Sequence, residues 1–174
     1  LFFGHQSVGN YMMSALEELG SDARYSLNRV RETEWRAVVQ QAPSGAIVDP
    51  EIGENANAAS KTAAFDDFMR NRGFGGNLGI ALFKFCFVDV KNSSWELLSA
   101  AEVERIYADY VAVMGRLESD FPATRFVYAT MPLERNDPHG NPLRNGYNQL
   151  VRDHCAAQSK PLFDIADIES VDAA

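Results

Sequence analysis

The chain opens with a change of hydrophobic period that marks a turn from a strand into a helix. Leu1 to Phe3 are three consecutive apolar residues, as is typical of a buried strand. From Val8 onward the apolar residues recur at helical spacing: Val8, Tyr11, Met12, Ala15, Leu16 and Leu19. Gly4 and Gly9 border the short segment between the two periods. The pattern predicts a buried strand that passes directly into an amphipathic helix.

Ser7 lies at this predicted turn. The first residues of a helix leave backbone N–H groups without partners, and the helix dipole adds a partial positive charge there. A serine at this position is suited to act as a nucleophile, because the same N–H groups can stabilise an oxyanion. The alternative is that Ser7 only caps the helix, which is the commoner role of a serine before a helix. The local sequence leaves both interpretations open.

Strands and helices are predicted to alternate along the rest of the chain. The apolar run from Ile80 to Val90 is typical of a central parallel strand, and further strands are expected at Ala46–Val48, Arg125–Thr130 and Pro161–Ile165. Helices are expected at Val8–Leu19, Lys61–Arg70, Ala101–Leu117 and Leu143–Gln158. Ser21–Pro50, with its Trp35–Val39 segment, is ambiguous. The alternation predicts an α/β protein with a parallel sheet and helices on both faces.

The length and charge of the chain restrict its function. Its 174 residues suit one domain, residues 1–174. Lys and Arg number 16 against 24 Asp and Glu, and this net charge of -8 disfavours a nucleic-acid partner. No apolar stretch is long enough for a membrane span. Cys86 and Cys155 are isolated and predicted to be free thiols, so neither a zinc site nor any other metal or cofactor is expected.

Polar residues fall at the predicted carboxyl ends of several strands. In a doubly wound sheet these ends converge on one crevice where ligands bind. We therefore expect one site to gather residues that follow different strands: Ser7, Gly53, Asn55, Asp89, Thr130, Asp164, Asp167 and Glu169.

Lys84 and the histidines are the candidate titrating groups. Lys84 stands inside an apolar strand, where a lysine must be paired or neutral. We favour a structural role, with Asp89 as a suitable partner, over a catalytic one. His5 is only two residues from Ser7, but we do not expect the backbone at this position to place the two side chains suitably; His139 is predicted in a turn and His154 late in a helix. None has the arrangement that a serine nucleophile needs from its base.

The segment Gly4-His5-Gln6-Ser7 resembles the first block of SGNH/GDSL-type hydrolases, and more closely a divergent branch that opens with Gly-His-x-Ser-Val-Gly. Later segments resemble further blocks of that branch: Ile52–Asn55 followed by Lys61 and Phe65, Lys84–Asp89, Thr130–Leu133, Arg144 with Tyr147-Asn148, and Phe163–Ser170. The resemblance implies a three-layer α/β/α sandwich with a flavodoxin-like sheet. It also implies esterase chemistry without a cofactor.

The resemblance also implies residue roles. Ser7 would be the nucleophile, its own N–H with Gly53 and Asn55 would form the oxyanion site, and Asp89 and Thr130 would help to bind substrate. Supporting roles would fall to His5, Lys84, Asp164 and Glu169. Two features of the family are not present: Cys86–Asp89 replaces its Gly-x-Asn-Asp block, and no Asp-x-x-His pair follows Glu169.

The sequence thus predicts a serine ester hydrolase for an acylated small molecule or glycan. Its base would be a histidine outside this sequence, because we expect the chain to lack its native start and a carboxyl-terminal catalytic segment. One alternative is a non-catalytic SGNH-like domain that binds a carbohydrate or a protein. Another is a nucleotide-binding flavodoxin-like domain, which is disfavoured because no Gly-rich phosphate loop follows the first strand.

Overall fold

A six-stranded parallel sheet forms the centre of the molecule. The computed structural model describes residues 1–20, 28–30, 34 and 46–170. The sheet order is β2-β3-β1-β4-β5-β6. The strands are β1 (Phe2–Gly4), β2 (Asn28–Val30), β3 (Ala46–Val48), β4 (Ile80–Phe83), β5 (Arg125–Ala129) and β6 (Leu162–Phe163). With the edge strand β2 set aside, the order is that of flavodoxin-like folds.

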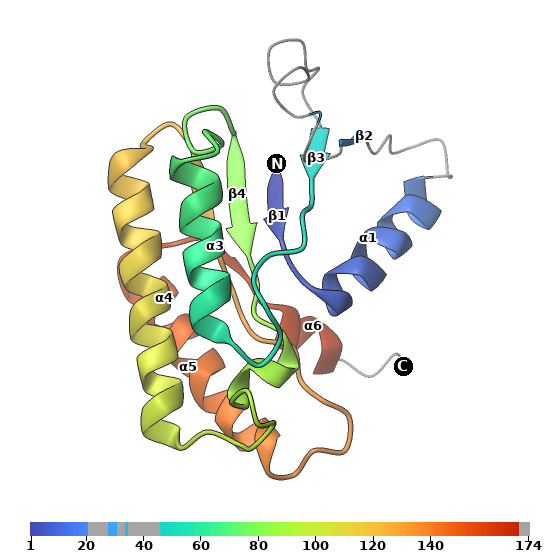
Figure 1. Cartoon of the computed structure of the whole chain (residues 1–174), viewed down its shortest axis with the longest axis vertical. Coiled ribbons are helices and arrows are strands. Elements are labelled where there is room, and N and C mark those ends of the chain that lie inside the picture. Colours follow the sequence, from blue (N-terminus) through green and yellow to red (C-terminus); the bar gives the residue numbers. More distant parts are fainter. Residues whose placement is uncertain (21–27, 31–33, 35–45, 171–174) are drawn as a thin grey trace.

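Helices cover both faces of the sheet (Figure 1). They are α1 (Ser7–Gly20), α3 (Ala58–Arg70), α4 (Ala100–Asp120), α5 (Gly140–Gln158) and the short α6 (Ile165–Ser170). The two apolar cores show which helix lies on which face. Phe2 packs against Phe65 and Phe68 of α3, whereas Phe3 shares a smaller core with Met13 of α1. The α/β/α sandwich expected from the sequence is confirmed.

The connections place a switch point between β1 and β4. After β1 and α1 the chain forms β2 and then β3 on one side of β1, and after β3 it crosses by α3 to β4 on the other side. Crossovers in opposite directions put α1 and α3 on opposite faces, and in doubly wound sheets the ligand site is expected beyond the carboxyl ends of the two strands at such a point. The residues that follow β1 and β4 therefore border the expected ligand site.

The expected strand Ile80–Val90 is wrong in its extent. The strand ends at Phe83, and Phe87–Val90 form a short 3₁₀ helix, η2. The Asp89 carboxylate accepts the backbone N–H of Cys86 and so closes the turn that begins this helix. Strand β2 and helix α6 were not expected, while the Trp35–Val39 segment lies outside the described residues.

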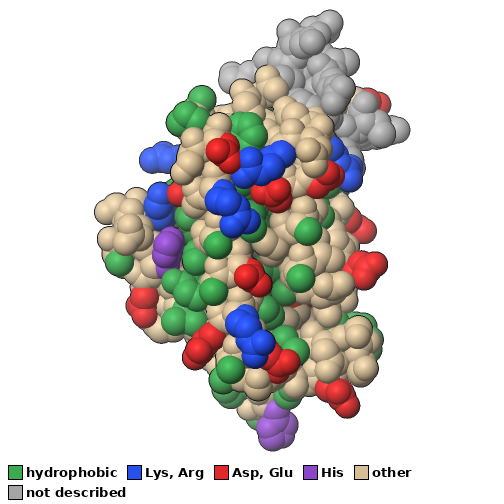
Figure 2. All heavy atoms as spheres, turned by 60° about the vertical axis from the view of Figure 1, so that its left-hand side comes forward, with side chains coloured by type: hydrophobic (Ala, Val, Ile, Leu, Met, Phe, Trp, Pro, Cys, Tyr) green, Lys and Arg blue, Asp and Glu red, His purple; other side chains and the backbone are tan. Residues whose placement is uncertain are grey.

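The described part of the chain has a charged surface and free thiols. Acidic and basic side chains are interspersed on the side of the molecule that carries α4 (Figure 2). Within the described ranges, no helix has the length and apolar character needed to cross a membrane. Cys86 is a buried free thiol, as predicted, and Cys155 is also free and buried.

Candidate active site

Ser7 is the first residue of α1, at the carboxyl end of a central strand. Its side chain is exposed, and in the part of the chain that the structure describes its hydroxyl has no hydrogen-bond partner. The preceding Gln6 holds the turn in place, because its Nε2 donates to the carbonyls of Ile52 at 3.1 Å and Gly53 at 2.8 Å. The strand-to-helix turn is thus tied to the loop that follows β3, and Ser7 is free to meet a ligand.

The buried side chain of His5 stabilises this turn. It is fully buried, with Nδ1 3.1 Å from the Gln6 carbonyl oxygen and Nε2 3.3 Å from Oδ2 of Asp49. Arg29 in turn donates to both oxygens of Asp49, at 2.8 and 2.6 Å. The imidazole lies against Gly9, where a Cβ would overlap the ring. Both ring nitrogens are therefore engaged, and His5 holds the first turn of α1 and is not free to act as a base for Ser7.

The loop after β3 presents Asn55 with a fixed orientation. Gly53 has a φ of +57°, and a Cβ there would lie 2.5 Å from the backbone N of Lys61, so the loop passes directly over the first turn of α3. The Oδ1 of Asn55 accepts a hydrogen bond from Lys61 Nζ at 3.0 Å. An ammonium can only donate, so this contact assigns the oxygen to Lys61 and leaves the Asn55 NH₂ group as the outward donor.

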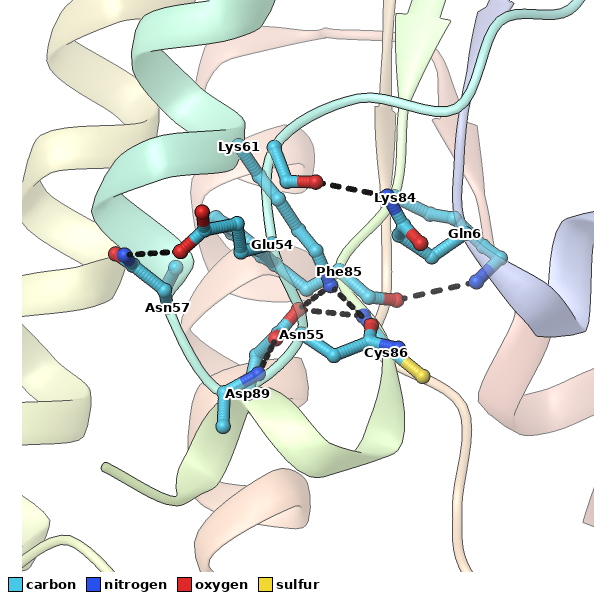
Figure 3. A network of polar contacts seen from close by, with 12 residues as sticks. Gln6, Glu54, Asn55, Asn57, Lys61, Lys84, Phe85, Cys86 and Asp89 are labelled. Carbon is cyan, nitrogen blue, oxygen red and sulfur yellow. Dashed lines mark hydrogen bonds and ion pairs between the residues drawn. The ribbon is translucent and has the colours of Figure 1, made fainter. Parts of the chain in front are cut away.

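A buried ion pair between Lys61 and Asp89 underlies this loop (Figure 3). Both side chains are fully buried, and Lys61 Nζ lies 2.6 Å from Asp89 Oδ2. Asp89 also accepts the backbone N–H groups of Ala56 at 3.0 Å and Cys86 at 2.7 Å. Asp89 thus joins the loop after β3 to the segment after β4. All its strong contacts are internal, so it positions the loop and does not face the crevice.

This pairing corrects the expected partner of Lys84. Asp89 is paired with Lys61, a residue that was not predicted to belong to the site. A signal for Lys61 exists in the sequence. It precedes Phe65 and Phe68 by four and seven residues, so helical spacing places it on the inward face of α3.

Thr130 and the acidic residues near the end of the chain form a second cluster. Thr130 is buried; its hydroxyl donates to Asp164 Oδ1 at 2.9 Å and accepts the Ala166 N–H at 3.1 Å. Arg152 donates to both oxygens of Asp164, and this lowers the pKa of the Asp164 carboxyl. Glu169 accepts the N–H of Leu133 at 3.3 Å, and burial raises its pKa. These contacts fasten α6 to the end of β5.

Lys84 is buried directly after β4, and few contacts stabilise its positive charge. Its exposed fraction is 1%, and its ammonium makes one long hydrogen bond, 3.4 Å, to the carbonyl of Phe85. Burial lowers the pKa of Lys84 to about 8. Four other ionisable groups also affect the pKa of Lys84 through their charges: Cys86 in the same segment, Asp89 in η2, Lys61 in α3 and Glu169 in α6.

Replacing Lys84 with Met is expected to stabilise the fold by about 3 kcal/mol at pH 7. The pKa of a lysine is near 10.5 in the unfolded chain and about 8 here, so the folded state binds the proton less tightly. The cost of charging the buried ammonium is fully present below pH 8 and shrinks as the pH rises toward 10.5. Urea unfolding at pH 7 and pH 9.5 measures this, and the advantage of the variant must be smaller at pH 9.5. If Lys84→Met were no more stable than the wild type at pH 7, this would contradict the burial of a charged ammonium at this position.

Comparison with known proteins adds no family to this picture. No protein-family model matches the chain, and neither does any curated protein. Among the described residues, no group of three or more His, Cys, Asp or Glu side chains could hold a metal ion. The fold and site define an α/β/α protein of flavodoxin-like topology, with an exposed serine at the switch point of its sheet.

Proposed function

We propose that the protein is a serine ester hydrolase of the SGNH/GDSL type that acts on an acylated small molecule or glycan. The observation that carries the proposal is the exposed Ser7 hydroxyl, which has no partner among the described residues and stands at the first turn of α1 beside the switch point. A crevice at such a point is where doubly wound sheets bind ligands. The motif resemblance of Gly4-His5-Gln6-Ser7 supports the same assignment.

In the proposed reaction, Ser7 Oγ attacks the acyl carbon of the ester and forms a covalent acyl-enzyme. The negative charge that develops on the carbonyl oxygen is stabilised by the Ser7 N–H, the loop at Gly53 and the NH₂ group of Asn55. Asn55 is suited to this work because Lys61 fixes its amide before substrate arrives. Pre-oriented donors of this kind need little reorganisation in the transition state.

Replacing Asn55 with Ala is expected to lower kcat by about 10²–10³ with a much smaller change in KM. An oxyanion donor acts chiefly in the transition state, so its loss appears in kcat. Steady-state kinetics on a short-chain aryl ester measure both constants, and Asn145→Ala, at an exposed position on α5, is the matched control. A change confined to KM would place Asn55 in ground-state binding instead.

The proposed function is tested by assaying the protein on a panel of short-chain aryl and sugar esters, with and without a fluorophosphonate that phosphonylates activated serines. We expect saturable hydrolysis that the fluorophosphonate abolishes. No turnover above the buffer rate on any ester, with no inhibitor bound, would contradict the proposal.

The alternative function is a non-catalytic domain that binds a carbohydrate or a protein. The engagement of both His5 nitrogens favours it, because the histidine nearest in sequence to Ser7 is not free to accept its proton. Glycan-array binding without hydrolysis of the same acylated glycans would support this alternative over the enzyme.

A further inference from the structure

Lys84 and Ser7 lie on the same face of the sheet at its switch point. Phe3 and Leu82 are register partners and share a core with Met13 of α1, so their side chains point to the α1 face. The Lys84 N–H donates to the Gly4 carbonyl at 3.1 Å, which continues the ladder by one step. Because side chains alternate along a strand, Lys84 points to the same face as Leu82. This is the face on which Ser7 begins α1.

The ammonium of Lys84 is suited to proton transfer and poorly suited to a structural ion pair. No carboxylate in the described residues lies within ion-pair distance of it; Asp89 is held by Lys61. A lysine that is buried without a carboxylate partner costs stability, as the low pKa of about 8 reflects. Groups kept at such a cost are concentrated at functional sites.

The other titrating groups near the strand ends are less suitable as a base. Both nitrogens of His5 are engaged by oxygen acceptors. Glu169 on α6 accepts a backbone N–H, and Asp89 of η2 accepts three hydrogen bonds. His139 lies before α5 and is exposed, whereas His154 is packed against Tyr128.

We propose that Lys84 is the general base that accepts the proton of Ser7. This inference rests on the proposed esterase function and names the group that completes it in this chain. The two side chains are not hydrogen-bonded in the resting structure. Contacts between a nucleophile and its base are often long before substrate binds, and tighten in the complex.

The proton and the electrons balance over two half-reactions. Neutral Lys84 takes the proton from Ser7 Oγ as the oxygen bonds to the acyl carbon and the carbonyl pair moves onto the oxygen. The tetrahedral intermediate collapses with cleavage of the bond to the alcohol, and the Lys84 ammonium returns the proton to the departing alkoxide. Lys84 then accepts a proton from the attacking water, and Ser7 Oγ recovers that proton when the acid leaves.

The test compares Lys84→Met and Lys84→Arg with the wild type, in kcat/KM for a short-chain aryl ester between pH 6 and pH 10. We expect both variants to lose about 10²–10⁴-fold, because a guanidinium keeps the charge but cannot accept a proton. The wild-type profile should rise with an apparent pKa of about 8, and the residual activity of the variants should lack this rise. Lys160→Met, at a lysine paired with Glu118, is the control and should keep the wild-type profile.

The outcomes separate this inference from the proposed function. Ser7-dependent activity that is unchanged in Lys84→Met overturns the base assignment and leaves the esterase in place. Activity retained in Lys84→Arg but lost in Lys84→Met also overturns it, because a positive charge at this position, and not proton acceptance, would then be what the reaction requires. Activity that does not depend on Ser7 overturns both proposals. Circular dichroism and urea unfolding of each variant exclude loss of the fold as the cause.

Discussion

Replacing Ser7 with Ala is expected to lower kcat/KM for a short-chain aryl ester by at least about 10³-fold. Without the hydroxyl no acyl-enzyme can form, and only the oxyanion donors and substrate binding remain to accelerate the reaction. Stability should change by no more than about 0.5 kcal/mol, since the Ser7 side chain is exposed and holds no hydrogen bond within the described residues. Initial rates over a range of substrate concentrations, with a urea unfolding curve, measure both effects.

Ser14→Ala is the matched control for this variant. Ser14 is exposed on the same helix and lies almost two turns away from the strand end, so its hydroxyl has no part in the proposed chemistry. Wild-type activity in Ser14→Ala with loss in Ser7→Ala is the expected pair of results. Equal activity in Ser7→Ala and the wild type, in preparations free of contaminating esterase, would contradict the nucleophile assignment.

Replacing Lys61 with Met is expected to destabilise the fold by about 3–5 kcal/mol. The variant leaves the fully buried Asp89 carboxylate without its cation, and an uncompensated buried charge is costly. The effect on stability is opposite to the one expected at Lys84, although both lysines are buried, because only Lys61 has a carboxylate within ion-pair distance. The free energy of unfolding from urea titration at pH 7 measures it.

Two further variants make this prediction specific. Lys61→Met combined with Asp89→Asn should be more stable than Lys61→Met alone, because the amide is neutral and its oxygen can still accept a backbone N–H. Lys160→Met breaks a partly exposed pair with Glu118 and should cost no more than about 1 kcal/mol. A loss below about 1 kcal/mol in Lys61→Met would mean that the pair contributes little to the fold.

The hydrophobic period predicts β1, β3, β4, β5 and β6 and the helices α1, α3, α4 and α5, but not the edge strand β2 or the short helix α6. The apolar spacing after Val8 and the alternation of short apolar runs with amphipathic segments both report local backbone geometry, which the sequence encodes residue by residue. The extent of β4 could not be predicted in this way. Residues 84 to 90 are nearly all buried whether they form a strand or a 3₁₀ helix, so the same apolar run fits both.

The partners of the buried lysines are a tertiary property that spacing does not encode. Asp89 is five residues from Lys84 and far in sequence from Lys61, yet it bonds Lys61 because α3 brings that side chain to the end of β4. The meeting of the turn before Ser7 with the Gly53 loop was predictable, since parallel strands share one carboxyl edge. The inward-facing contacts of Asp89, Thr130 and Asp164 were not, because a polar residue at a strand end can face either the crevice or the core.

The covalent state of Ser7 during turnover is the most direct test of its proposed role as nucleophile. The protein is mixed with 4-nitrophenyl acetate, quenched in acid within the first turnovers, digested and analysed by mass spectrometry. We expect one acetyl group on the peptide that contains Ser7, at an amount that matches the initial burst of nitrophenol, and none on this peptide in Ser7→Ala. Turnover without an acetylated Ser7, or acetyl groups spread over surface lysines in proportion to reagent alone, would contradict this role.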